Sequence, residues 1–181
     1  NQAGTETTIA AGRMTPGYAS PEQARGEPIG VASEVYQLGL VLHLLLTDQL
    51  PYEIERGSAY EVARTISEAS IQRPSELWRN AESVAERAES FGERPDRIRR
   101  ALQGDLDNIV LTALAREPQK RYASAAALAE DLCRHLDRLP IKARAATRRY
   151  RLARFVQRHK PAVAGFTAFI ALLVTSVILL G

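Results

Sequence analysis

The sequence predicts a mainly α-helical protein, in which a bundle of helices is followed by one transmembrane helix. Between residues 33 and 139, apolar residues recur at intervals of three and four, a spacing typical of helices that bury one face. Proline and glycine interrupt this pattern often enough to divide it into several helices. Residues 162–180 then carry no charged side chain. These three observations set the predicted fold class.

The first long helix is expected to be the central, buried one. It starts at Ser33, a favourable N-cap residue, and its apolar residues lie almost all round the helix. A helix of about fourteen residues is too short to cross a bilayer, so burial inside a domain explains its composition better. Residues 48–51 end it, with a proline at the last position.

The remaining helices of the bundle are predicted in order along the chain. One spans 58–69, and the charged stretch 75–104 holds one or two surface helices. In that stretch Trp78 is expected to be a packing residue, and breaks are expected at Gly92 and Pro95. Two more helices are expected, each with a capping residue at its start. One begins at Asp105 and ends before Pro118, and the other begins at Ser124 and ends at Pro140.

Charge is distributed unevenly along the chain. The formal net charge is only +3, yet residues 142–160 contain eight Lys or Arg and no acidic residue. A nucleic-acid-binding protein spreads such charge over a folded face with aromatic residues, whereas this segment adjoins an apolar stretch. We therefore expect a membrane-facing role and no nucleic-acid partner.

The apolar stretch that follows predicts a transmembrane helix over 161–181. Its nineteen uncharged residues give a helix of about 29 Å, close to the thickness of the hydrocarbon core. The basic segment 141–160 would be juxtamembrane and would keep the preceding body in the cytoplasm by the positive-inside rule. The expected location is the inner (cytoplasmic) membrane, crossed once.

Two interpretations of the basic segment remain open. Its residues could form an interfacial helix on anionic lipid, or they could simply mark the topology of the span. The residues concerned are Tyr150, Arg151, Arg154, Phe155 and Arg158.

Several chemically suggestive residues are better explained as structural. His43, His135 and His159 do not have the spacing of a metal site. Asp105 and Asp107 precede an apolar helical run, which makes helix capping the stronger explanation. The single cysteine, Cys133, excludes an intrachain disulfide and is expected to be a buried thiol. No secretory signal is present, and a start in mid-motif suggests a fragment.

Three separated motifs point to one family. The residues Thr15 to Gln23, TPGYASPEQ, resemble the end of the activation segment of a serine/threonine protein kinase. Residues 33–39 resemble the start of the central helix of that domain, and residues 121–124 resemble the linker before its last helix. From about residue 4 to residue 139, the chain thus resembles the C-terminal lobe of a bacterial-type serine/threonine protein kinase. The resemblance implies a kinase-like helical lobe.

The resemblance divides the chain into four parts and assigns structural roles. Residues 1–25 would form the activation segment and substrate loop and 26–140 the helical lobe, followed by the juxtamembrane segment and the span. Glu22 stands in the family's Ala-Pro-Glu motif and would form a buried ion pair with Arg121. Glu34 takes the place of an aspartate that holds the catalytic loop in active kinases, one methylene longer.

The resemblance also implies functional residues near the N-terminus. Thr15 and Pro16 correspond to the substrate-binding loop, and Thr5, Thr7 and Thr8 lie where activation-loop phosphorylation is expected. The Gly-rich loop, the strand lysine and the two aspartate motifs of kinases are missing from this sequence. No catalytic, cofactor-binding or metal-binding residue is therefore assigned in this chain, and the chain alone should be inactive.

The expected function is that of a membrane-anchored kinase in transmembrane signalling. With ATP and Mg, the complete enzyme would transfer the γ-phosphoryl group to Ser or Thr of a protein substrate. Its partners would be that substrate, the bilayer and a second copy, through dimerisation for activation. The alternatives are a non-catalytic pseudokinase or membrane adaptor, indicated by Glu34, and a tail-anchored protein of unrelated fold.

Overall fold

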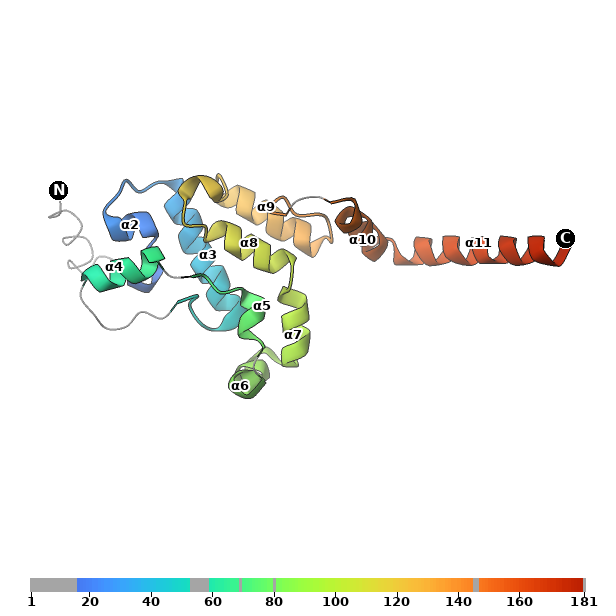
Figure 1. The fold of residues 1–181 in the computed structure, drawn as a ribbon, viewed down its shortest axis with the longest axis horizontal. Coiled ribbons are helices and arrows are strands. Elements are labelled where there is room, and N and C mark those ends of the chain that lie inside the picture. The colour runs from blue at the N-terminus through green and yellow to red at the C-terminus, as the bar shows by residue number, and fades with distance from the viewer. Residues whose placement is uncertain (1–15, 53–58, 69, 80, 145–146, 181) are drawn as a thin grey trace.

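The computed structural model describes residues 16–52, 59–68, 70–79, 81–144 and 147–180. Within these ranges the chain is mainly helical and no strand occurs. A compact helical body holds α2 to α9, and α10 lies at the end of the body from which α11 extends (Figure 1). The prediction of a mainly α-helical protein is confirmed for this part of the chain.

The chain enters the body through two short elements, the 3-10 turn η1 (Pro16–Tyr18) and the helix α2 (Pro21–Arg25). The cap of α2 is reciprocal, since Ser20 Oγ accepts from the backbone N of Gln23 and Gln23 Oε1 accepts from the backbone N of Ser20. The helix ends at Gly26, whose positive φ of 68° glycine adopts without strain. This capping box places a short helix in a segment predicted to be a loop.

The long helix α3 (Val31–Thr47) crosses the body and packs against α5, α8 and α9. It begins three residues earlier than predicted, because Gly30 is the N-cap and Ser33 lies inside the first turn. Ser33 Oγ donates instead to Glu22 Oε1 at 2.7 Å. The prediction of Ser33 as the N-cap was wrong, since its hydroxyl donates to Glu22 of α2 and Gly30 occupies the N-cap position.

The other helices of the body follow the predicted order. Gly92, with a φ of 65°, separates two of them where a break was expected, and Ser124 Oγ caps the last one by accepting from Ala127 N at 3.1 Å. The elements are α4 (Ala59–Glu68), α5 (Pro74–Leu77), α6 (Ala81–Phe91), α7 (Pro95–Leu102), α8 (Asp105–Ala113), η2 (Pro118–Lys120) and α9 (Ala125–Leu136).

Apolar side chains form the core on both sides of α3. Tyr36 and Leu40 face a cluster with Ile66 of α4, and Val35 faces a second cluster that includes Ile109 of α8. In a third cluster Trp78 is 1% exposed and packs edge-on against Phe91 with ring centroids 5.3 Å apart. Trp78 is thus a packing residue, as predicted.

The single cysteine has a different environment from the predicted one. Cys133 is exposed on α9 and is not paired. The buried positions of this helix are Leu128 and Asp131. The prediction of a buried thiol was wrong because Cys133 lies off the face that α9 packs against α3 and α8.

The C-terminal part contains α10 (Arg148–Arg158) and α11 (Lys160–Leu180). A helix over the predicted transmembrane stretch is therefore present. A bilayer crossing requires both sufficient length and sustained apolarity, and among the residues that the structure describes, no helix satisfies both conditions. The predicted transmembrane helix over 161–181 is corrected accordingly.

Candidate functional site

A buried ion pair joins the predicted activation segment to the predicted helical lobe. Glu22 on α2 and Arg121, directly after η2, are 99 positions apart in the sequence. Arg121 Nη1 donates to Glu22 Oε1 at 2.6 Å and Nη2 donates to Glu22 Oε2 at 2.9 Å. The two side chains are 0% and 4% exposed. This bidentate pair is the contact that the sequence resemblance implied.

The remaining hydrogen-bonding groups of the pair are also satisfied. Arg121 donates further bonds to the carbonyl oxygens of Ala32 at 2.7 Å and Ala115 at 2.7 Å. Its guanidinium lies 4.8 Å from the centroid of the Tyr36 ring. A buried charge is tolerated when its donors and acceptors are paired in this way. The pair therefore holds α2, the start of α3 and the α8–η2 connection together.

The electrostatics of Glu22 reflect these partners. Burial alone would raise the pKa of Glu22, but hydrogen bonds from Arg121 and Ser33 outweigh it and lower the pKa to about 2. Glu22 is therefore ionised throughout the physiological pH range. The short segment before it, η1, packs Tyr18 against the core cluster around α3. The ion pair thus fixes the place where the predicted substrate loop meets the body.

The predicted functional residues lie mostly outside the described part of the chain. Thr5, Thr7, Thr8 and Thr15 are outside it, so their assignments stay predictions. Pro16 is described as the first residue of η1.

One face of α3 is uncovered in this structure. Val31, Leu38, Val41 and Leu45 are 42–67% exposed although they are apolar, and their spacing places them along one side of the helix. Glu34 is exposed at the start of the same stripe. The α3 stripe, as we call these five residues, combines an apolar surface with one carboxylate at its N-terminal end.

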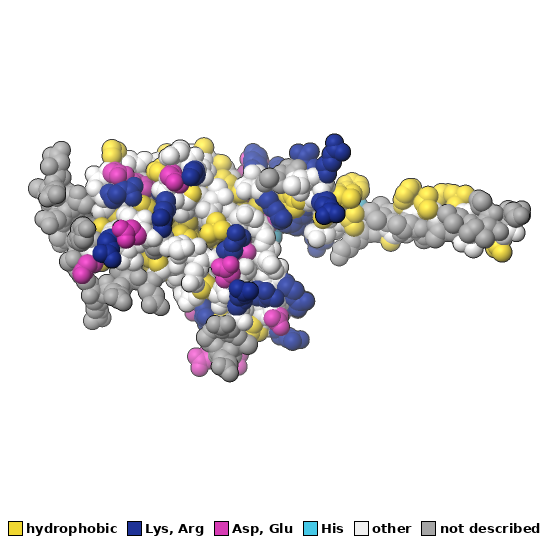
Figure 2. All heavy atoms as spheres, in the orientation of Figure 1, with side chains coloured by type: hydrophobic (Ala, Val, Ile, Leu, Met, Phe, Trp, Pro, Cys, Tyr) yellow, Lys and Arg dark blue, Asp and Glu magenta, His cyan; other side chains and the backbone are white. Residues whose placement is uncertain are grey.

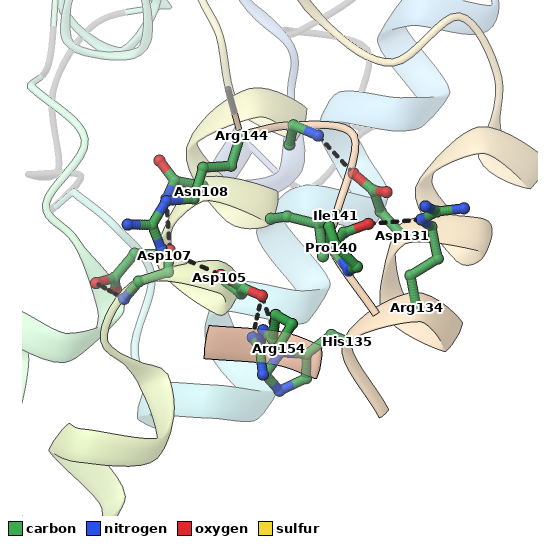
Figure 3. A network of polar contacts seen from close by, with 12 residues as sticks. Asp105, Asp107, Asn108, Asp131, Arg134, His135, Pro140, Ile141, Arg144 and Arg154 are labelled. Atoms are coloured by element: carbon green, nitrogen blue, oxygen red, sulfur yellow. Dashed lines mark hydrogen bonds and ion pairs between the residues drawn. The ribbon is translucent and has the colours of Figure 1, made fainter. Parts of the chain in front are cut away.

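A second polar network fastens the basic segment to the body (Figure 3). Asp131 of α9 is fully buried, and its carboxylate accepts from the backbone N of Lys142 at 2.7 Å and of Ala143 at 2.8 Å. Tyr122 donates its hydroxyl to the same carboxylate at 3.0 Å. Ile141, next to these amides, is 2% exposed in the core. Sequence reasoning missed this contact.

The same segment is bound a second time through Asp105. Tyr150 of α10 donates its hydroxyl to Asp105 Oδ2 at 2.7 Å and accepts from the backbone N of Ile141 at 3.1 Å. Arg154 forms an ion pair with the same carboxylate. The prediction that Asp105 caps α8 was therefore wrong, because its carboxylate is used by α10.

Two further predictions can be assessed from this network. Asp107, the third residue of α8, does cap the helix, since its carboxylate accepts from Gly104 N at 3.3 Å. Tyr150 and Arg154 point into the body, so these two members of the predicted interfacial helix are not available to a lipid surface.

The chain is similar in sequence to known proteins over most of its length. No family model matches the chain. Over 128 residues it is 37% identical to a probable serine/threonine-protein kinase of Corynebacterium efficiens, covering 71% of this chain and 16% of the relative. It is 34% identical over 132 residues to the serine/threonine-protein kinase PknB of Mycobacterium tuberculosis, covering 72% and 17%. It is 30% identical over 126 residues to the serine/threonine-protein kinase PknD of Chlamydia abortus, covering 70% of this chain and 11% of the relative.

These relatives are much longer than the region they share with this chain, which spans between 11% and 17% of their length. The similarity extends over more than two thirds of this chain. The chain is therefore related to the bacterial serine/threonine protein kinases.

Proposed function

We propose that this chain forms the C-terminal lobe of a serine/threonine protein kinase and supports its protein-substrate loop. The observation that carries the proposal is the buried bidentate pair of Glu22 and Arg121. It joins the segment after the predicted substrate loop to the body through α2. The complete enzyme would use Mg-ATP to phosphorylate Ser or Thr in a protein, and the lobe would contribute substrate positioning.

The α3 stripe supports this proposal independently. Apolar side chains along one helix face are stabilised when another segment covers them. In a complete kinase the part of the domain that carries the catalytic loop would cover this stripe. The carboxylate of Glu34, at its end, would then accept hydrogen bonds from the backbone of that loop. The lobe would thereby position the catalytic loop beside the substrate loop.

A graft into a related enzyme tests the proposal. Residues 4–144 of this chain replace the corresponding segment of PknB of M. tuberculosis, and transfer of radiolabelled phosphate from ATP to a protein substrate is measured. We expect the graft to phosphorylate the substrate above the level of a matched graft whose catalytic-loop aspartate is replaced by Asn. Cooperative thermal unfolding and ATP binding show that both grafts are folded.

A folded, ATP-binding graft that transfers no phosphate would contradict the kinase assignment and support the second candidate, a non-catalytic adaptor. The observation favouring that candidate is Glu34, whose extra methylene changes the reach of the carboxylate. A graft carrying Glu34→Asp distinguishes an effect of this one side chain from a non-catalytic lobe. Activity that appears only with Asp assigns the loss to this side chain, whereas inactivity of both grafts supports the adaptor.

A further inference from the structure

A pocket lies where α10 meets the ends of α7 and α8. Its volume is about 510 Å³, within the size range of small-ligand sites. Arginine dominates its charged lining, with Arg100 from α7, Arg144 from the segment before α10, and Arg149 and Arg154 from α10. Among the described residues that line it, Asp105 supplies the one carboxylate. Figure 2 shows Lys and Arg side chains gathered at this end of the body, beside the extended α11.

Asp105 balances only part of this positive charge. The Asp105 side chain is 2% exposed, and its carboxylate forms an ion pair with Arg154. Nη1 of Arg144 lies 3.4 Å from Asp105 Oδ1 (Figure 3). The pKa of His135 beside it is lowered, first by burial and then by the positive charge of Arg154. Both effects favour the neutral imidazole. The described lining of the pocket therefore holds four guanidinium groups and one carboxylate.

Two of these arginines have donor groups that remain available. In the described part of the chain, the Arg149 side chain forms no hydrogen bond or ion pair and is exposed. Arg100 uses Nε for the carbonyl oxygen of Asp96 at 3.0 Å, which leaves its terminal nitrogens for another acceptor. The two side chains come from different helices, so an anion between them would be held from two sides.

We infer that this pocket binds the phosphate monoester of a phosphorylated Ser or Thr in a protein segment. Such a group carries a charge of about −1.5 to −2 and three acceptor oxygens, which match several guanidinium groups. Arginine clusters are a general means of recognising phosphorylated peptides. Thr147, at the pocket rim and at the N-cap of α10, adds a hydroxyl. The pocket is distinct from the substrate loop, because it lies beside α10 and not beside α2.

The shape and charge of the pocket favour a peptide over a bilayer surface. A bulk phospholipid phosphodiester carries a single negative charge and lies in a flat layer. A phosphorylated side chain projects from its backbone and can enter a concave site. Of the two guanidinium groups that pair with Asp105, that of Arg154 is largely buried, with its side chain 16% exposed, so a ligand must enter the pocket to reach it.

The test uses the full chain and a short peptide containing phosphothreonine, with the unphosphorylated peptide, inorganic phosphate and vesicles of phosphatidylglycerol as comparison ligands. Binding is measured by isothermal titration calorimetry at fixed, near-physiological salt. We expect saturable binding of the phosphopeptide, at least tenfold tighter than binding of the unphosphorylated peptide. Weaker binding of inorganic phosphate is expected, because it lacks the peptide contacts.

Two double variants with the same change in charge identify the site. Arg100→Ala with Arg149→Ala removes the two available arginines and is expected to weaken phosphopeptide binding at least tenfold. Arg148→Ala with Arg151→Ala removes two exposed arginines of α10 that do not line the pocket, and is expected to change affinity less than twofold. Circular dichroism confirms that each variant keeps its helices.

An equal loss in both double variants would overturn the inference, because it would assign binding to overall charge. Equal affinity for the phosphorylated and the unphosphorylated peptide would also overturn the inference. Binding to vesicles without binding to the phosphopeptide would replace it with a lipid-surface role. Since the assay measures binding only, none of these outcomes depends on kinase activity.

Discussion

At the scale of single residues, Glu22 and Arg121 show why a charge can be buried in this protein. Glu22 accepts three bonds, two from Arg121 and one from Ser33, and Arg121 also donates to backbone carbonyls. The cost of removing both charges from water is offset only while this set is complete. Loss of one partner leaves a charge without compensation.

The first prediction concerns the arginine. Arg121→Ala leaves Glu22 buried and unpaired, and we expect the free energy of unfolding to fall by about 3–5 kcal/mol. Urea denaturation followed by circular dichroism measures the change. Arg25→Ala is the matched control, since Arg25 pairs with Glu27 at the surface, with side chains 40% and 48% exposed. Such a pair is worth less than about 1 kcal/mol, so similar losses in both variants would contradict this account.

The second prediction concerns pH. The pKa of Glu22 is lowered from 4.5 to about 2, so its contribution to stability is complete above pH 4.5 and is lost as the pH falls toward 2. The corresponding free energy is about 3 kcal/mol. Carbon-13 NMR of the Glu22 carboxyl group measures the pKa directly, and Glu27, which is exposed, provides the comparison. A Glu22 pKa of 4 or above would contradict the described ion pair.

At the scale of elements, α3 approaches α8 closely because Gly39 has no side chain. A Cβ atom at this position would lie 2.9 Å from Ala113 Cβ and 2.9 Å from Leu114 Cδ2. These distances are shorter than a normal van der Waals contact, so the two helices would have to separate. Gly39 therefore permits the central packing of the body.

The third prediction follows from this contact. Gly39→Ala is expected to destabilise the protein by about 1–3 kcal/mol through overpacking, even though Ala favours helix. Thermal unfolding measures the effect. Gly165→Ala in α11 is the control, because a Cβ there meets no atom within 4 Å. A Gly39→Ala protein as stable as the control variant would show that α3 and α8 are not so closely packed.

The fourth prediction concerns the attachment of the basic segment. Asp131→Asn keeps the shape of the side chain but removes the negative charge of the carboxylate. That carboxylate accepts hydrogen bonds from the backbone amides of Lys142 and Ala143. We expect amide hydrogen exchange over residues 141–144 to accelerate at least tenfold. Glu130→Gln is the matched control, since Glu130 is exposed and its carboxylate pairs with the side chains of Arg134 and Lys142, with Lys142 Nζ at 2.7 Å. Unchanged exchange in the Asp131 variant would rule out this attachment.

At the scale of the whole molecule, local signals predicted the helices well and distant contacts poorly. Periodicity and the cap at Ser124 depend on neighbouring residues, so the order of the helices could be predicted. The Glu22–Arg121 pair was expected only because both residues stand in motifs of a known family. No local pattern indicates that Asp105 binds Arg154, 49 positions away.

The incorrect predictions have the same origin. Ser33 and Asp105 are good capping residues, but each side chain is used by a more distant partner. Cys133 was assigned to the interior by residue type, although α9 packs through another face. The transmembrane prediction relied on the composition of one stretch, and among the described residues no helix meets the requirements for a span.

The most direct measurement of the central claim is a double-mutant cycle between Glu22 and Arg121. Glu22→Gln, Arg121→Met and the double variant are compared with the unmodified protein by urea denaturation. A buried contact predicts that the double variant is more stable than the sum of the single losses implies, with a coupling of about 2–3 kcal/mol. Additive losses, with a coupling below about 0.5 kcal/mol, would show that the two residues do not meet and would contradict the proposed kinase lobe.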